Sequence, residues 1–386
     1  MMNLITDVDV RTSNEYTVHI GTDLIDRAGA LISETLSGTG KTKTAYGKKI
    51  AVISDSNVAP LYLDRVCRSL IDEGFTAVSF VFDAGEKSKN ADTLESIWNF
   101  LAENEITRSD CIVALGGGVV GDISGFAAAT FLRGIDFIQI PTTLLAAVDS
   151  SVGGKTAIDL RSGKNLAGAF LQPLTVICDT ESLKTLPCNT LIDGMAECIK
   201  YAVLRGGRIL ELFNEISISD KDDKDSIYSA LEDYLPEIIA ESVKIKADYV
   251  VADEFDNGER KMLNLGHTIG HSLEKMSSFK LTHGCAVSLG MSIITKGSEA
   301  LGYTEKGTWE AVNSLLRKFF LPTDLEGYKN IIPTSDYKAI AKNALGDKKR
   351  NGDVISLVIP ERIGRCTLRD IPVAEIENFV SLGLKG

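Results

Sequence analysis

In the first half of the chain, short apolar runs alternate with stretches of helical character. Most of these runs are rich in β-branched or aromatic residues and end at turn or polar residues, which is typical of strands. Strands that alternate with helices predict a mostly parallel sheet in an α/β fold. The predicted strands are Tyr16–Ile20, Ile50–Ser54, Ala77–Phe82, Cys111–Leu115, Phe137–Ile140 and Thr175–Cys178.

The pattern changes after Pro187, where apolar residues follow a helical period. Apolar side chains at 192, 195, 196, 199 and 203 share one helix face. The predicted helices are Ile192–Leu204, Leu231–Val251, Leu263–Met276 and Ala286–Leu301. We place a boundary near Leu186–Asn189 and expect an α/β domain over residues 1–187 and a mainly helical domain over residues 188–386. Two exposed segments are also expected, the loop Ser37–Lys49 and the charged run Asp220–Asp225.

Composition limits the classes of protein to consider. The 386 residues are 44% hydrophobic and 24% charged, as in ordinary globular proteins. The chain shows neither a long apolar run nor a secretory leader, and its seven cysteines form no CxxC pair. We therefore expect a cytoplasmic protein with reduced thiols. A net charge of −12 argues against nucleic acid or an anionic membrane as a partner.

A glycine-rich turn follows the predicted strand Cys111–Leu115. Gly116, Gly117 and Gly118 precede Asp122 and the helical run Ile123–Phe131. A strand, a glycine turn and a helix N-terminus together are suited to holding a pyrophosphate, although a plain structural turn has the same pattern. The segment GGKT at 153–156 does not match an ATP-binding loop, because Asp149 occupies the position of that loop's first glycine. The segment GKT at 40–42 fails in the same way, since Thr35 occupies the corresponding position.

A second cluster contains histidines. Three of the four histidines of the chain fall between residues 267 and 283. His267 and His271 share a face of the helix predicted from 263, as does Asn264, while Glu197 lies in an earlier helix with Lys200 on the same face. Two histidines and a carboxylate with an open position are the usual ligands of a catalytic divalent metal. The spacing does not decide which histidines bind, and histidines without a metal remain an alternative.

Basic residues in an acidic chain suggest an anionic substrate. Arg133, Lys155, Lys164 and Asn165 lie near the glycine-rich turn. Lys200, Lys246, Arg260 and Lys348 lie in the helical half.

These motifs together resemble the 3-dehydroquinate synthase family of sugar-phosphate cyclases. The likeness begins with LGGGVVGD and continues through GMAECIKYA (194–202), RKMLNLGHTIGH (260–271) and HGCAVSLGM (283–291). It covers nearly the whole chain and implies a Rossmann-like NAD-binding domain followed by a mainly helical metal- and substrate-binding domain. It also implies a homodimer that converts a small anionic sugar phosphate, 3-deoxy-D-arabino-heptulosonate 7-phosphate, into 3-dehydroquinate and phosphate.

The resemblance implies roles for individual residues. The metal, zinc or cobalt, would be bound by Glu197, His267 and His283, with His271 outside the ligand set. NAD would contact Asp55, Asn57, Glu86, Lys89, Gly117, Gly118, Val119, Asp122, Thr142, Thr143, Lys155, Lys164 and Thr185. Substrate positioning and proton transfer would fall to Arg133, Asp149, Lys155, Asn165, Lys200, Lys246, Arg260, Asn264, His271 and Lys348.

Three alternatives remain at this point. Cyclases acting on glucose 6-phosphate or sedoheptulose 7-phosphate depart from the GlyGlyLys and GlyLysAsn patterns that are intact here. Metal-dependent polyol dehydrogenases typically use Asp where Glu197 stands, and they form NADH in net amounts. A non-catalytic binding protein would have lost a metal ligand or Lys155. One departure from many relatives is AlaIleAsp at 157–159, where GlyIleAsn or GlyValAsn is common.

Overall fold

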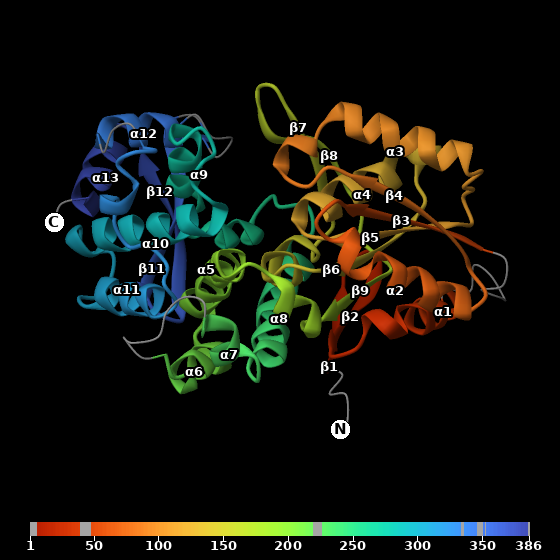
Figure 1. Cartoon of the computed structure of the whole chain (residues 1–386). Helices are drawn as coiled ribbons and strands as arrows, with labels where there is room; N and C mark the ends of the chain where they lie inside the picture. The colour runs from red at the N-terminus through yellow and green to blue at the C-terminus, as the bar shows by residue number, and fades with distance from the viewer. Residues whose placement is uncertain are drawn as a thin grey trace. The chain divides into compact units, whose positions relative to one another are not determined.

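The computed structural model describes residues 6–38, 48–218, 226–332, 336–345, 350–351 and 353–384. It contains two compact units (Figure 1). One unit holds the residues up to Leu186 together with Lys246–Phe255, and the other holds Pro187–Ile245 and the residues from Asp256 onward. The ends of the expected loop Ser37–Lys49 fall in a helix and a strand; its middle lies outside the described residues, as does Asp220–Asp225.

The first unit is built on a seven-stranded sheet. Its order is β1-β2-β9-β6-β5-β3-β4, and only the β1–β2 pair is antiparallel. The strands are β1 (Thr6–Arg11), β2 (Glu15–Gly21), β3 (Lys49–Asp55), β4 (Thr76–Phe82), β5 (Cys111–Gly116), β6 (Asp136–Pro141) and β9 (Thr175–Asp179). All six predicted strands are present and the sheet is mostly parallel, so these predictions are confirmed. The edge strand β1 was not predicted.

Two hydrophobic cores cover the two faces of this sheet. On one face, α1 (Ala28–Gly38) and α2 (Ala59–Asp72) pack on alternate residues of the central strands, such as Val52 and Val113. On the other face, α3 (Ala91–Glu103) and α4 (Gly118–Thr130) pack on the intervening residues, such as Ile53 and Ile112. Strands covered on both faces have no polar side, which explains their continuous apolar sequence.

A separate hairpin packs against α4. Its strands are β7 (Lys155–Leu160) and β8 (Gly163–Phe170), which pair antiparallel. The short helical segments of this unit are η1 (Ile25–Arg27), η2 (Glu86–Ser88), η3 (Phe131–Arg133), η4 (Ala146–Ser150) and η5 (Thr180–Thr185). The hairpin therefore carries Lys155, Lys164 and Asn165, which follow the glycine-rich turn in the chain.

The second unit is mainly helical, as predicted, and also contains a three-stranded antiparallel sheet that was not predicted. A hydrophobic core joins α9, α10, α12 and α13 to β11 (Figure 1). Its helices are α5 (Cys188–Arg205), α6 (Gly207–Glu215), α7 (Ile227–Leu231), the first part of α8 (Leu235–Ala252), η7 (Glu259–Asn264), α9 (His267–Met276), α10 (His283–Ala300), α11 (Thr308–Lys318), η8 (Glu326–Tyr328), α12 (Tyr337–Leu345), η9 (Val373–Glu375) and α13 (Ile376–Leu384). Its strands are β10 (Arg350–Asn351), β11 (Val354–Arg362) and β12 (Arg365–Pro372).

The predicted helices Ile192–Leu204 and Ala286–Leu301 correspond to α5 and α10 with slightly different ends, and three other predicted helical segments differ more. The helix expected over Leu231–Val251 is the end of α7 followed by α8, and the helix over Leu263–Met276 is the end of η7 followed by α9. Gly266 interrupts the latter with a φ of 78°, so Asn264 does not share a face of α9 with the histidines. The third helix, α4, starts at Gly118 instead of Ile123, which places Asp122 in its second turn.

None of the helices in the described ranges has the length and apolar character needed to cross a bilayer. All seven cysteines are free thiols.

Candidate functional site

Three of the predicted metal ligands meet inside the second unit. Glu197 lies in the middle of α5, while His267 and His283 are the first residues of α9 and α10. The Nε2 atoms of His267 and His283 lie 3.3 and 3.2 Å from the same carboxylate oxygen, Oε1 of Glu197. The Glu197 side chain is fully buried. The fold thus brings two ring nitrogens and one carboxylate together from three helices.

The hydrogen bonds of the two rings orient them toward Glu197. Nδ1 of His267 lies 3.0 Å from the carbonyl oxygen of Leu265, and Nδ1 of His283 lies 3.5 Å from Oε1 of Glu274. Both neighbours are acceptors and can take a hydrogen bond from a protonated Nδ1. With the proton on Nδ1, the Nε2 lone pair of each ring faces the Glu197 carboxylate. That arrangement suits a cation bound between them.

The spacing of these atoms fits a divalent metal. Ligand atoms at 2.0–2.1 Å around a tetrahedral cation lie roughly 3.3 Å from one another. The two nitrogen-to-oxygen distances, 3.3 and 3.2 Å, match this value. Three protein ligands with a remaining open position form the arrangement of a catalytic zinc site, in which the metal acts as a Lewis acid.

The charges around Glu197 support the same interpretation. Burial alone would raise the pKa of its carboxyl group, but the Lys200 ammonium, three residues further along α5, and the nearby histidines hold that pKa well below its usual range. Burial lowers the pKa of His267 to about 4, so this ring is neutral at physiological pH. A carboxylate and a neutral imidazole are the protonation states that metal binding requires. Burial lowers the pKa of His283, but the carboxylates of Glu197 and Glu274 outweigh it and raise that pKa to about 10, so a bound metal would displace a proton from this ring.

Glycines allow the three helices to approach closely enough to form this site. A Cβ on Gly290 of α10 would lie 1.9 Å from the carbonyl oxygen of Gly266, just before α9. A Cβ on Gly284 would lie 2.0 Å from the carbonyl oxygen of Asp193 in α5, and the Asp193 carboxylate also accepts the amide of Cys285 at 3.1 Å. Asp193, which the sequence analysis did not single out, lies one turn before Glu197 and holds α5 to the start of α10.

The close contact at Gly290 leads to the first prediction. We expect Gly290→Ala to push α9 away from α10, lower the stability by about 1–3 kcal/mol and weaken zinc binding. Denaturant unfolding and zinc titration measure the two effects. Gly327→Ala is the matched control, because a Cβ there meets no atom within 4 Å. Equal stability and zinc affinity in the two variants would contradict this account of helix packing.

A second group of possible ligands shares His283. His271, Glu274 and His283 have ligand atoms within 4.8 Å of one another. His271 is exposed and Glu274 is buried. Glu274 was not predicted as a site residue, although it follows His267 by seven residues and His271 by three, which is the spacing of one helix face.

In the first unit, a network surrounds Lys89. Its ammonium lies 2.5 Å from Oδ2 of Asp122 in α4 and 2.6 Å from Oδ1 of Asn165 in β8. The amide of Asn165, which has a φ of 54°, donates to Asp159 at 2.9 Å. Beside this network, Lys164 and Glu86 form an ion pair of 3.4 Å. Residues predicted to bind NAD or substrate thus come together from η2, α4 and the hairpin, and Asp159, which was not predicted to take part, holds Asn165.

Burial affects the charges of this network. The pKa of Asp122 is raised to about 6 by burial, against the opposing effect of the Lys89 ammonium. For Lys89, burial lowers the pKa, but the carboxylates of Asp122 and Glu86 outweigh it and the net shift is upward. Lys89 therefore stays charged in an almost fully buried position.

The glycine-rich turn differs in conformation from our expectation. Gly116, Gly117 and Gly118 have no positive φ, so their role is to permit close contact. A Cβ on Gly116 would lie 2.5 Å from Val120, and one on Gly117 would lie 3.1 Å from Thr143. The turn packs directly against the segment after β6, where the amide of Thr142 donates to the Gly116 carbonyl.

Lys246 and Asp149 form a third pair. The Lys246 ammonium donates to the carbonyl oxygen of Asp149 at 2.5 Å and to its Oδ1 at 2.7 Å. Lys246 belongs to the part of α8 that groups with the first unit, so this contact lies within that unit.

Burial separates the predicted basic residues into two classes. Among the lysines and arginines of the described ranges, five are buried: Lys48, Lys89, Lys200, Lys246 and Arg260. Because burying a cation is costly, the four predicted residues of this set are the stronger candidates for a functional role. Arg133 and Lys155 are exposed, and Lys348 lies outside the described residues.

The remaining predicted residues lie at turns. The Asp55 carboxylate accepts the amides of Asn57 and Val58 at the end of β3. The Thr143 hydroxyl accepts the amide of Ala146, and Thr185 hydrogen-bonds Tyr62 at 2.6 Å. Gly118 and Val119 open α4, and Asn264 ends η7.

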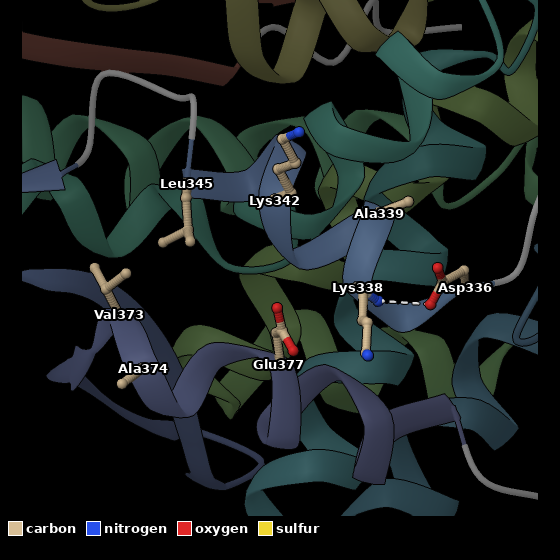
Figure 2. Close-up of a pocket in the computed structure, with 8 residues that line it drawn as sticks. All are labelled: Asp336, Lys338, Ala339, Lys342, Leu345, Val373, Ala374 and Glu377. Atoms are coloured by element: carbon tan, nitrogen blue, oxygen red, sulfur yellow. Dashed lines mark hydrogen bonds between the residues drawn. The ribbon is translucent and has the colours of Figure 1, made fainter.

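A cavity of about 490 Å³ lies elsewhere, beside α12 and the start of α13 (Figure 2). None of the predicted site residues lines it. Its lining residues are Asp336, Lys338, Ala339, Lys342, Leu345, Val373, Ala374 and Glu377.

Comparison with known proteins links this geometry to one family. A family model described as 3-dehydroquinate synthase N-terminal matches residues 79–193, and one described as 3-dehydroquinate synthase C-terminal matches residues 194–350. The 3-dehydroquinate synthase of Clostridium acetobutylicum is 44% identical over 368 residues, which are 95% of this chain and 96% of that protein.

Solved structures share the fold. A 2-deoxy-scyllo-inosose synthase, complexed with carbaglucose-6-phosphate, NAD⁺ and Co²⁺, aligns with a TM-score of 0.82 at 24% identity over 98% of this chain and 100% of the other. The 2-epi-5-epi-valiolone synthase of Streptomyces hygroscopicus subsp. jinggangensis 5008, with NAD⁺ and Zn²⁺ bound, aligns with a TM-score of 0.79 at 22% identity over 95% and 96% of the two chains.

Proposed function

Because the chain belongs to the 3-dehydroquinate synthase family, we propose that it converts 3-deoxy-D-arabino-heptulosonate 7-phosphate into 3-dehydroquinate and phosphate. The observation that carries the proposal is the convergence of His267 and His283 on one oxygen of Glu197. The reaction needs an oxidisable alcohol to be polarised, and this group can hold the metal for that task.

The metal centre is proposed to lie in the second unit. Zinc or cobalt at Glu197, His267 and His283 would supply a Lewis acid for the substrate alcohol and for the ketone derived from it. Lys200 balances the charge of Glu197 from the same helix. We assign proton exchange with the substrate to His271, which lies one turn beyond His267 and is exposed.

NAD is proposed to bind the first unit, which forms most of the domain assigned to residues 1–187. Bound NAD⁺ would supply a hydride acceptor that returns the hydride within the same turnover. The Lys89 network offers a buried ammonium that suits an anionic cofactor. Both structural neighbours contain NAD⁺, which supports this assignment.

The substrate carries a phosphate and a carboxylate, which suit basic side chains. We assign the binding of these two anionic groups to five basic residues, Arg133, Lys155, Lys246, Arg260 and Lys348. We assign polar contacts with the substrate to Asp149, Asn165 and Asn264. The orientation of Lys246 is maintained by Asp149, which accepts two of its hydrogen bonds. The buried guanidinium of Arg260 can hold an oxyanion with two parallel hydrogen bonds.

The experiment that tests this function also makes the second prediction. Purified protein with zinc and the heptulosonate phosphate should release phosphate only when NAD⁺ is added, and reduced NAD should not accumulate, because the hydride is returned. Phosphate assays and the absorbance of NADH measure both. Stoichiometric formation of NADH would instead indicate a polyol dehydrogenase, and release from glucose 6-phosphate a different cyclase.

We further infer a homodimer in the cytoplasm. The family resemblance supports the dimer, and the free thiols agree with a reducing compartment. Light scattering on the purified protein tests the oligomeric state.

A further inference from the structure

The imidazole of His283 is held between two carboxylates. Its Nε2 faces Oε1 of Glu197 at 3.2 Å, and its Nδ1 faces Oε1 of Glu274 at 3.5 Å. Glu274 comes from α9, the helix that begins with His267, whereas His283 begins α10. One helix therefore provides a metal ligand at its start and, two turns later, a contact to a ligand on its neighbour.

Glu274 is buried in a way that calls for a functional explanation. Its side chain is 8% exposed, and that of His283 is 30% exposed. An ionised carboxylate at such a position is costly unless it is paired and hydrogen-bonded. The His283 ring, 3.5 Å away, is a partner that offsets part of this cost.

We infer that Glu274 is a positioning residue of the metal centre. It accepts a hydrogen bond from Nδ1 of His283, which keeps the proton on that nitrogen, fixes the ring plane and leaves the Nε2 lone pair for the metal. The negative charge also makes the ring a stronger ligand. The carbonyl of Leu265 does the same for His267, without a full charge. The inference rests on the proposed metal-dependent function.

A second cation bound by His271, Glu274 and His283 is the competing interpretation of the same atoms. It requires Nδ1 of His283 to be a ligand while Nε2 binds the first metal. The ring would then lose both protons and become an imidazolate. Hydrogen bonding to Glu274 requires only the neutral ring, which is why we favour the positioning role.

Zinc affinity provides the third prediction. Competition with a chromophoric chelator should show that Glu274→Ala weakens binding about 10- to 100-fold, the usual effect of removing a partner behind a histidine ligand. Glu274→Gln should lose less zinc affinity, because the glutamine amide oxygen can still accept a hydrogen bond from Nδ1 of His283. Ser272→Ala is the matched control. It removes a buried hydrogen bond to Ile340 from the same helix but does not involve His283, and it should bind zinc like the unaltered protein.

The cobalt-substituted protein gives a second measurement. Its visible absorption should shift in Glu274→Ala and remain unchanged in Ser272→Ala, because only the former changes a ligand's orientation and basicity. Equal zinc affinities in Glu274→Ala and Ser272→Ala would overturn the inference. So would two zinc ions per chain in the unaltered protein and one in Glu274→Ala. Failure of the unaltered protein to bind any zinc would instead reject the proposed metal-dependent function.

Discussion

Replacing His267 with alanine is expected to remove the metal and abolish phosphate release. The substitution deletes one of three converging ligands, and the two that remain, Glu197 and His283, form an incomplete site. The loss of zinc affinity should exceed the roughly 10- to 100-fold effect expected of an outer partner. Equilibrium dialysis with elemental analysis measures the metal, and a phosphate assay measures turnover.

His271→Ala is the matched variant, since this histidine lies one turn further along the same helix and is exposed. It should retain zinc and lose turnover, because we place it in proton transfer instead of metal binding. If His271→Ala lost the metal and His267→Ala retained it, our choice of ligands would be wrong. Full activity in protein shown to contain no metal would reject the metal centre altogether.

Replacing Arg260 with alanine is expected to weaken substrate binding with little effect on NAD. A hydrogen bond to a charged group contributes about 1.5–3 kcal/mol, which corresponds to about 10- to 150-fold in the dissociation constant. Arg260 lies in η7 of the second unit, whereas the proposed NAD network around Lys89 lies in the first. Titration calorimetry with each ligand separates the two affinities.

Lys89→Ala provides the reciprocal comparison. It removes the ammonium that links Asp122 to Asn165 and should weaken NAD binding more than Arg260→Ala does. Thermal unfolding of both variants checks that each is folded, since both side chains are buried. An Arg260→Ala protein that lost NAD binding but kept its substrate affinity would show that this residue belongs to the other site.

The central strands and the edge strand β4 were predictable from sequence, while the edge strand β1 and the hairpin strands were not. Strands such as β3 and β5 are covered by helices on both faces, so their sequences are apolar throughout. In β1, Asp7 and Asp9 alternate with Val8 and Val10, and four of the eight residues of β8 are glycine or alanine. Such segments acquire their strand conformation from a partner strand, and a single sequence carries little trace of that partner.

The basic residues show a similar division. Motif positions identified Lys89, Lys155, Lys200 and Arg260 as candidates of equal standing. The structure separates them, because Lys155 is exposed and the other three are buried. Burial depends on which elements pack over a side chain, and contacts between elements distant in the chain determine it.

By itself, the sequence determined the α/β character of the first half, the helical character of the second, and the residue types available for a metal, a cofactor and an anion. These features follow from local hydrophobic period and from motifs a few residues long. The spacing of the histidines left the ligand set open, and only the family resemblance implied His267. The tertiary structure brings His267 rather than His271 to Glu197, and it alone shows that Glu274 lies behind His283. The reason is that Gly266 starts α9 at His267, while Gly290 lets α10 approach it closely, so the ligand set depends on how three helices pack.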